Sequence, residues 1–130
     1  MIVVDASMLY TTLVDDAADG DRARERLSGE ALAAPMLVDL EIVSSLRRGV
    51  RDGLVDERRS RRALAGLSAL RLRRARHLPL LPRIWELREN VTSYDAAYVA
   101  LAELLGVALL TADARLARAP GPRCAVELWA

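Results

Sequence analysis

The sequence predicts an α/β fold in which helices cover both faces of a mainly parallel central sheet. Short apolar runs at 2–4 and 107–111 show no polar alternation, which is typical of strands buried on both faces. Segments with helical spacing of apolar residues separate the strands, as in βα repeats. A length of 130 residues with 52% hydrophobic residues is sufficient for one domain, 1–130, with a single core.

The first 34 residues predict two strands and two helices. In order, these elements are a strand at 2–4, a helix at 7–13, a polar helix at 22–27 and a short strand at 31–34. Gly29 follows the polar helix, where glycine commonly ends a helix. Asp5 comes directly after the first strand, at its carboxyl end.

The next segment predicts a helix with Pro35 in its first turn and with Gly49 and Gly53 breaking it. Residues at three- and four-residue spacing define the face that we expect to pack on the core: Leu37, Leu40, Val43, Ser44 and Leu46. Glu41 lies inside this apolar pattern. We therefore expect its carboxylate on the core-facing side of the helix.

The remaining chain alternates helices with strands. The predicted elements are an Arg-rich helix at 56–70, a weak edge strand at 72–78, helices at 79–90 and 94–105, and strands at 107–111 and 125–129. Gly106 ends the second of these helices. Asp95 lies at the start of that helix, where Thr92 or Ser93 can cap it, and Asp113 follows the strand 107–111 by two residues.

Four acidic residues occupy positions that favour a shared site. Asp5 and Asp113 follow strands, and ligands of open parallel sheets bind beyond the carboxyl ends of the strands. Together with Asp95 and Glu41 they would repel one another unless a divalent cation supplied the opposite charge. Oxygen donors without His or Cys select a hard ion, Mg²⁺ or Mn²⁺, over Zn²⁺. Each acid taken alone also fits a cap or an ion-pair partner of an arginine.

The net charge of +1 conceals a strong asymmetry along the chain. The net charge is −6 over residues 1–46, +8 over residues 47–76 and −1 over residues 77–130. Acids suited to a metal and arginines suited to phosphate are one interpretation, and a solvated helical face is the other.

Other chemistry-bearing residues are few. Cys124 is the single cysteine, which excludes an internal disulfide and a zinc cluster, and we expect it to be a small buried core residue. His77, the single histidine, is predicted to be a surface or packing residue. The sequence starts without a secretion signal and has no apolar run long enough for a membrane span, which predicts a cytoplasmic protein.

Four blocks of sequence carry a family resemblance. They are Val-Val-Asp-Ala-Ser at 3–7, Ala-Pro-Met-Leu-Val-Asp-Leu-Glu at 34–41, Thr-Ser-Tyr-Asp-Ala-Ala-Tyr-Val-Ala-Leu-Ala-Glu at 92–103 and Leu-Leu-Thr-Ala-Asp-Ala-Arg-Leu at 109–116. In this order the blocks resemble VapC-type toxins of the PIN-domain family, nearly end to end. The segment 51–90 matches little beyond its length.

The resemblance implies a PIN-like domain over 1–130 with one acidic active site. Its members would be Asp5, Glu41, Asp95 and Asp113. The acids matching Asp5 and Asp95 are the usual magnesium ligands of the family, with Glu41 and Asp113 in support through metal waters or water activation. Ser7 and Thr111 match small polar residues beside the acids, where a hydroxyl can hold a carboxylate or a water of the metal.

The resemblance also implies an activity and partners. These are Mg²⁺-dependent, or Mn²⁺-dependent, hydrolysis of RNA phosphodiester bonds by the toxin of a type II toxin-antitoxin system, a VapB-type antitoxin that covers the cleft, and a homodimer. We expect arginines of the basic segment to position RNA phosphates. The candidates are Arg47, Arg48, Arg58, Arg59, Arg61 and Arg62.

Several other classes of protein fit less well. A phosphotransfer receiver requires a lysine, and the chain has none; a haloacid-dehalogenase-type phosphatase requires a second Asp where Ser7 stands. No glycine-rich loop is present for a Rossmann or P-loop enzyme. A nuclease acting on DNA flaps is usually much longer. The serious alternative is a non-catalytic PIN-like module that binds RNA or protein without cutting.

Overall fold

The apolar runs form a five-stranded sheet with the strand order β3-β2-β1-β4-β5 in the computed structural model, which describes residues 1–130. The strands are β1 (Ile2–Val4), β2 (Leu32–Pro35), β3 (Leu72–Ala75), β4 (Leu109–Thr111) and β5 (Val126–Leu128). Every neighbouring pair is parallel. The predicted parallel sheet is therefore confirmed, with the weak strand β3 at one edge.

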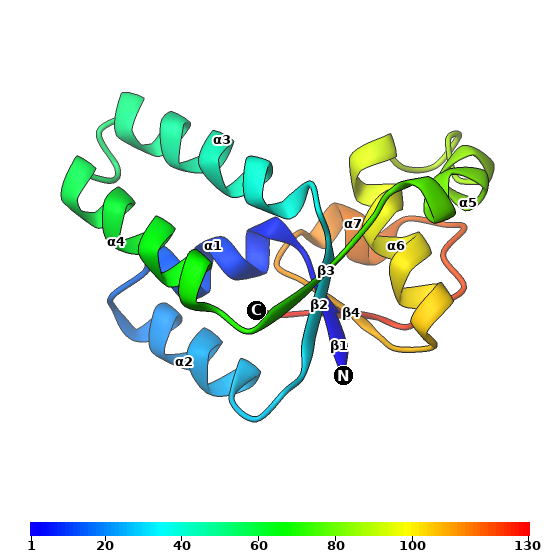
Figure 1. The fold of residues 1–130 in the computed structure, drawn as a ribbon, viewed down its shortest axis with the longest axis horizontal. Helices are drawn as coiled ribbons and strands as arrows, with labels where there is room; N and C mark the ends of the chain where they lie inside the picture. The colour runs from blue at the N-terminus through cyan, green and yellow to red at the C-terminus, as the bar shows by residue number, and fades with distance from the viewer.

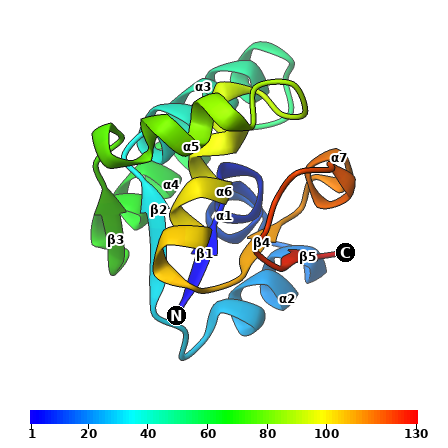
Figure 2. The ribbon, with the colours of Figure 1, turned by 90° about the vertical axis from the view of Figure 1, so that its right-hand side faces the viewer.

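Helices cover both faces of the sheet, as predicted (Figure 1). They are α1 (Ala6–Val14), α2 (Ala18–Leu27), α3 (Val38–Arg51), α4 (Glu57–Ala69), the 3₁₀ turn η1 (Leu78–Leu80), α5 (Leu81–Glu86), α6 (Ser93–Leu105) and α7 (Ala114–Arg118). Helices α1 to α4 gather on one side, where α1 packs against α2, α3 and α4. Figure 2 shows α6 lying across the other face, where it contacts β1, β2 and β4.

The central strands and α6 form the core. Val3 and Val4 of β1 are fully buried, as are Leu109 and Leu110 of β4. Helix α6 is buried continuously over residues 96–102, because four of these seven residues are alanines that let it lie close to the strands. Apolar burial on both sides of the sheet is the main driving force for this arrangement. The carboxyl ends of β1 and β4 are thereby fixed beside the start of α6.

Two boundary predictions for the helix after β2 are wrong. Pro35 is the last residue of β2, paired with Ala75, and does not start the helix. Proline is tolerated at a strand end, where its missing N–H removes no essential ladder bond. Gly49 does not break α3, which continues to Arg51. A Cβ at Gly49 would lie 2.9 Å from Tyr10 Oη, so this glycine permits close packing between α1 and α3.

The apolar face predicted for α3 is also partly wrong. Leu40 and Val43 are exposed, whereas Val38, Ile42 and Leu46 are buried. The buried stripe follows the four-residue spacing 38, 42 and 46, which is the better fit to a helix packed on α1. This rotation leaves Glu41 at the border of the buried stripe, half-buried rather than in the core.

The other predicted elements are present with shifted ends. The helix expected at 79–90 is divided into η1 and α5, and the strand expected at 107–111 begins at Leu109. Gly106 ends α6 with a φ of 66°, in the left-handed conformation that favours glycine.

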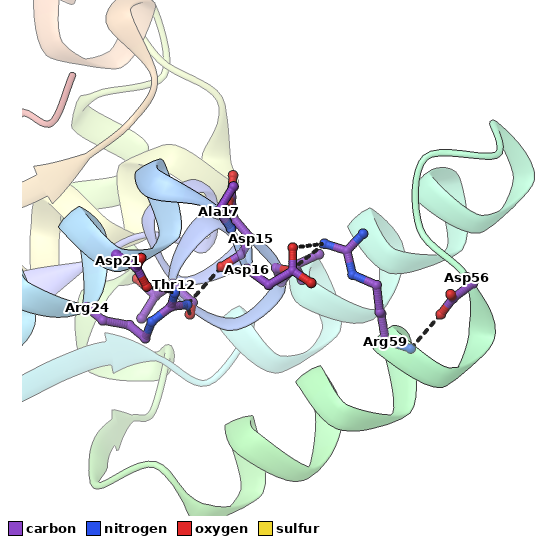
Figure 3. Close-up of polar contacts among 9 residues, drawn as sticks. Thr12, Asp15, Asp16, Ala17, Asp21, Arg24, Asp56 and Arg59 are labelled. Atoms are coloured by element: carbon purple, nitrogen blue, oxygen red, sulfur yellow. Dashed lines mark hydrogen bonds and ion pairs between the residues drawn. The ribbon is translucent and has the colours of Figure 1, made fainter.

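Two arginines bind the C-terminal end of α1 and the turn that follows it (Figure 3). Arg24 of α2 donates to the carbonyl oxygens of Thr12 and Asp15, at 2.9 and 2.8 Å. Arg59 of α4 donates to the carbonyl oxygen of Val14 at 2.7 Å and pairs with Asp16 at 3.5 Å. These contacts satisfy the carbonyl groups that a helix end leaves unpaired and place positive charge at the negative end of the helix dipole.

Candidate active site

The four acids predicted from the sequence line one cavity of about 620 Å³. We call it the acid cavity. Its lining comprises Asp5, Ala6, Ser7, Leu37, Leu40, Glu41, Ser44, Ser45, Arg48, Tyr94, Asp95, Tyr98, Asp113 and Arg115. The cavity lies beyond the carboxyl ends of β1 and β4, which is where parallel sheets commonly bind ligands.

Asp5 is held by three donors. It follows β1 and caps α1, accepting at Oδ1 from the Met8 backbone N–H at 3.0 Å. The same oxygen accepts from Ser7 Oγ at 2.7 Å, and Oδ2 accepts from Thr111 Oγ1 at 2.5 Å. Asp5 is only 5% exposed, so these hydrogen bonds replace water around a buried carboxylate. Ser7 and Thr111 thus hold a carboxylate, which is one of the two roles that the resemblance implied.

The Ser7 and Thr111 hydroxyls also connect Asp5 to the segment that carries Asp113. The backbone N–H of Ala112 donates to Ser7 Oγ at 3.0 Å, and that of Asp113 donates to Thr111 Oγ1 at 2.9 Å. Asp113 then caps α7 by accepting from the Arg115 backbone N–H at 2.8 Å. One hydrogen-bonded network therefore fixes the ends of β1 and β4 relative to each other.

Asp95 and Glu41 approach the cavity from helices. Asp95 lies in the first turn of α6, and its backbone N–H donates to the Thr92 side chain at 3.2 Å, which confirms Thr92 as the cap. Glu41 accepts at Oε1 from the hydroxyl of Tyr98 at 2.5 Å. Tyr98 is 1% exposed and comes one helical turn after Asp95. Its hydroxyl therefore fixes the position of Glu41 from inside the core.

Burial and mutual repulsion make the ionised acids unfavourable here. Burial raises the pKa of Asp5 against the opposing effect of its hydrogen bonds with Thr111 and Ser7. Burial likewise raises the pKa of Glu41, with further contributions from the charges of Asp95 and Asp5. The pKa of Asp95 is raised by burial and then by the charge of Asp113. Burial also raises the pKa of Tyr98, so its hydroxyl stays protonated and donates.

The donor set fits a hard divalent cation. All four acids offer oxygen ligands, and burial together with neighbouring acids raises the pKa values of Asp5, Glu41 and Asp95. No three acidic, cysteine or histidine groups converge into a preformed cage. Mg²⁺ does not require one, because it keeps several waters and commonly binds through one or two carboxylates together with substrate phosphates.

Of the six arginines predicted to position phosphate, Arg48 lines the acid cavity. The others do not line it. Arg59 instead binds the end of α1, and Arg61 pairs with Glu57 on its own helix at 2.8 Å. The Arg-rich helix α4 packs against α1 and α3 and presents Arg58 and Arg62 to solvent.

Sequence reasoning missed several residues of the cavity. Tyr98 was part of an apolar helix pattern, and nothing in that pattern indicates that its hydroxyl meets Glu41 from a helix 57 positions away in sequence. Tyr94 and Arg115 also line the cavity. The signal available in the sequence was that Tyr94 directly precedes Asp95 and that Arg115 comes two residues after Asp113. Leu40 lines the cavity because α3 is rotated from the predicted face.

A larger cavity, of about 730 Å³, lies between η1, the end of α6 and the segment before β5. Its lining is mostly apolar and includes Cys124, which is half-buried rather than fully buried as expected. Arg83 and Glu103 form an ion pair at 2.9 Å in its wall. None of the four acids borders it, so we assign the chemistry to the acid cavity. His77 has a packing role, since its Nε2 accepts from the Leu37 backbone N–H at 3.1 Å.

Comparisons with known proteins agree with this fold. The model of the PIN domain matches residues 2–122. Ribonuclease VapC9 of Mycobacterium tuberculosis is 43% identical over 128 residues, 98% of each chain. Ribonuclease VapC1 of the same organism is 43% identical over 127 residues, which cover 97% of this chain and 96% of the relative. The crystal structure of PAE2754 from Pyrobaculum aerophilum has a TM-score of 0.72 at 27% identity and covers 98% of this chain and 83% of that one.

The chain therefore belongs to the PIN domain family and, within it, to the VapC ribonucleases. This confirms the resemblance that the four sequence blocks indicated. No helix combines the length and the apolar character that a membrane span requires.

Proposed function

We propose that this chain is the toxin of a type II toxin-antitoxin pair and acts as a Mg²⁺-dependent endoribonuclease, with Mn²⁺ as a possible substitute. The observation that carries the proposal is the acid cavity, where Asp5, Glu41, Asp95 and Asp113 meet. Asp5, Glu41 and Asp95 have raised pKa values, and none of these three forms an ion pair with an arginine; Asp113 pairs with the exposed Arg115 at 3.7 Å. A cavity lined by carboxylates favours a cation, and an anion can bind there only together with such a cation.

The four acids have different roles in the proposal. Asp5 and Asp95 would hold the ion directly, and Asp113 and Glu41 would support it through its waters or help to orient the attacking water. A bound Mg²⁺ polarises a phosphoryl oxygen and lowers the pKa of water, which makes hydrolysis possible at neutral pH. Ser7 and Thr111 keep Asp5 in place by donating to its two oxygens.

The reaction is hydrolysis of an internal phosphodiester. Water adds at phosphorus while one P–O ester bond breaks, so one fragment keeps the phosphate and the other gains a hydroxyl. Glu41, held by Tyr98, would accept a proton from that water. Arg48 and Arg115 border the cavity and would neutralise phosphates of the bound strand.

Two partners belong to the proposal. A VapB-type antitoxin would cover the acid cavity, and a second copy of the chain would form a homodimer. Exposed apolar side chains along α3 support a protein-binding surface: Leu40, Val43 and Val50.

The test is cleavage of RNA by the purified chain with Mg²⁺, with Mn²⁺ and with a chelator. We expect cleavage with either ion and none with the chelator. Asp95→Asn should lower the rate by at least about a hundredfold without unfolding the protein, because it removes one charge that attracts the cation while keeping the shape of the side chain.

The matched control for Asp95→Asn is Asp21→Asn, which neutralises an exposed acid that pairs with Arg24 outside the cavity. Its cleavage rate should equal that of the wild type. A folded wild type that binds RNA but does not cut it with any divalent ion would contradict the proposal and favour a non-catalytic binding module.

A further inference from the structure

Tyr94 differs from the other aromatic residue of the acid cavity. The Tyr98 hydroxyl is used inside the protein, where it donates to Glu41. Tyr94 lines the same cavity and is 66% exposed. An exposed aromatic ring contributes little to the core, so the stability of the fold does not explain its position.

The position of Tyr94 relates it to the reacting centre. It directly precedes Asp95 in the first turn of α6, and both residues line the acid cavity. Neighbouring residues on a helix point in directions about 100° apart, so the ring lies beside the carboxylate and not over it. Leu40, from α3, is the other large apolar side chain exposed at this cavity, at 72%. The cavity thus combines a flat apolar ring with charged groups.

We propose that Tyr94 stacks against an unpaired base of the RNA next to the bond that is cut. This inference rests on the proposed ribonuclease function. A nucleotide beside the bond that is cut carries a charged phosphate. Its base, which has flat apolar faces, is joined to that phosphate through the sugar ring. The arginines of the cavity and a cation held by its acids would suit the phosphate, and Tyr94 and Leu40 suit the base.

Stacking on Tyr94 requires an accessible base face. In a duplex both faces are covered by neighbouring base pairs, and uncovering one requires the base to be unstacked and unpaired. Tyr94 therefore favours unpaired segments over helical ones without reading a particular base, because every base has such a face. Stacking on a ring neutralises no phosphate, so the contribution of Tyr94 does not depend on counterion release.

The experiment measures the Kd for a pool of short unpaired RNAs of random sequence and for a duplex of equal length. Both are measured over a range of salt concentrations in the non-cleaving Asp95→Asn protein. Tyr94→Phe keeps the ring and should bind within about twofold of the parent. Tyr94→Leu removes the ring and should weaken binding of unpaired RNA about tenfold or more with an unchanged salt slope. Binding of the duplex should stay the same.

Trp85→Leu is the matched control. Trp85 is an equally exposed aromatic residue, at 67%, and lies outside the acid cavity on α5. Its replacement should leave the Kd for unpaired RNA unchanged. Ultraviolet cross-linking to the same RNA pool, followed by mass spectrometry, should identify the peptide that contains Tyr94 and not the peptide that contains Trp85.

The outcomes separate this inference from the proposed function. If Tyr94→Leu binds unpaired RNA as tightly as Tyr94→Phe, the stacking role is wrong, even where the wild type cuts RNA. If the ring matters for binding but the wild type cuts no RNA with any divalent ion, the cleavage proposal is wrong and the stacking role stands. Absence of RNA binding by the wild type and by Asp95→Asn overturns both.

Discussion

The two ends of helix α1 differ in whether arginines neutralise the negative charge that lies there. At the C-terminal end, Arg24 and Arg59 bind the turn that contains Asp15 and Asp16, through carbonyl oxygens and an ion pair (Figure 3). At the N-terminal end, Asp5 caps the helix and borders a cavity with three more acids. The chain has 19 arginines, so it does not lack cations with which to neutralise this cluster.

This difference supports the proposal that the acid cavity receives a cation from outside the protein. Asp5 and Glu41 are held by hydroxyl and backbone donors, which orient a carboxylate without cancelling its charge. At the other end of α1 the guanidinium groups supply the charge themselves. The first arrangement gives up some stability in the metal-free state, and the second contributes stability under all conditions near neutral pH.

The largest expected effect on stability comes from breaking the arginine contacts. Arg59→Ala removes the hydrogen bond to the Val14 carbonyl and the ion pair with Asp16. Its backbone N–H still donates to the cap Asp56, so α4 keeps its start. We expect a loss of about 1–2 kcal/mol, or a fall in melting temperature of about 3–8 °C, measured by thermal unfolding.

Arg58→Ala is the control for Arg59→Ala. Arg58 precedes Arg59 on α4 and is exposed to solvent. Its replacement should change stability by less than about 0.5 kcal/mol. If both variants lose the same stability, the contacts of Arg59 with the end of α1 do not specifically stabilise the fold. The contrast between the two ends of α1 is then wrong.

A smaller effect of opposite sign is expected at the acid cavity. Glu41→Gln keeps the acceptor for the Tyr98 hydroxyl and removes a charge that burial, Asp95 and Asp5 oppose. We expect the metal-free variant to melt a few degrees above the metal-free wild type at neutral pH. Asp16→Asn, which removes the partner of Arg59, should instead melt slightly lower.

The gain from Glu41→Gln should depend on pH in a defined direction. The folded pKa of Glu41 is raised, so the ionised form destabilises the folded state at pH values above that pKa. The gain should therefore be largest at pH values above the folded pKa and should vanish as the pH falls to about 4.3, the value for an unfolded glutamate. A gain that stays constant from neutral pH to pH values below 4 would show that charge is not its cause.

Much of the candidate site could be predicted because local patterns determine it. Asp5 and Asp113 follow apolar strands, and Asp95 follows a capping residue, so the ends of elements indicate where these acids lie. Predicting that Glu41 belongs to the site required knowledge of how its helix is positioned within the fold. The face of α3 was misjudged because Leu40 and Val43 are apolar yet exposed, and composition does not distinguish a core face from a surface that contacts a ligand or partner.

Contacts between distant segments could not be predicted. Tyr98 meets Glu41, and Ser7 meets the segment after β4, only because the sheet brings these elements together. The same holds for Arg59. The charge pattern places it in one group with its exposed neighbours, but its side chain donates a hydrogen bond to the end of α1. The role of Arg58 and Arg62 in positioning RNA stays a prediction.

The central claim is that the acid cavity takes its missing positive charge from a divalent cation. The direct measurement is the melting temperature of the wild type and of Asp95→Asn, each with a chelator and with saturating Mg²⁺. At a hundredfold excess over Kd, an ion that binds the folded state alone adds about 2.7 kcal/mol. We predict a rise of several degrees for the wild type and a much smaller rise for Asp95→Asn. Equal rises in the two proteins would contradict the claim.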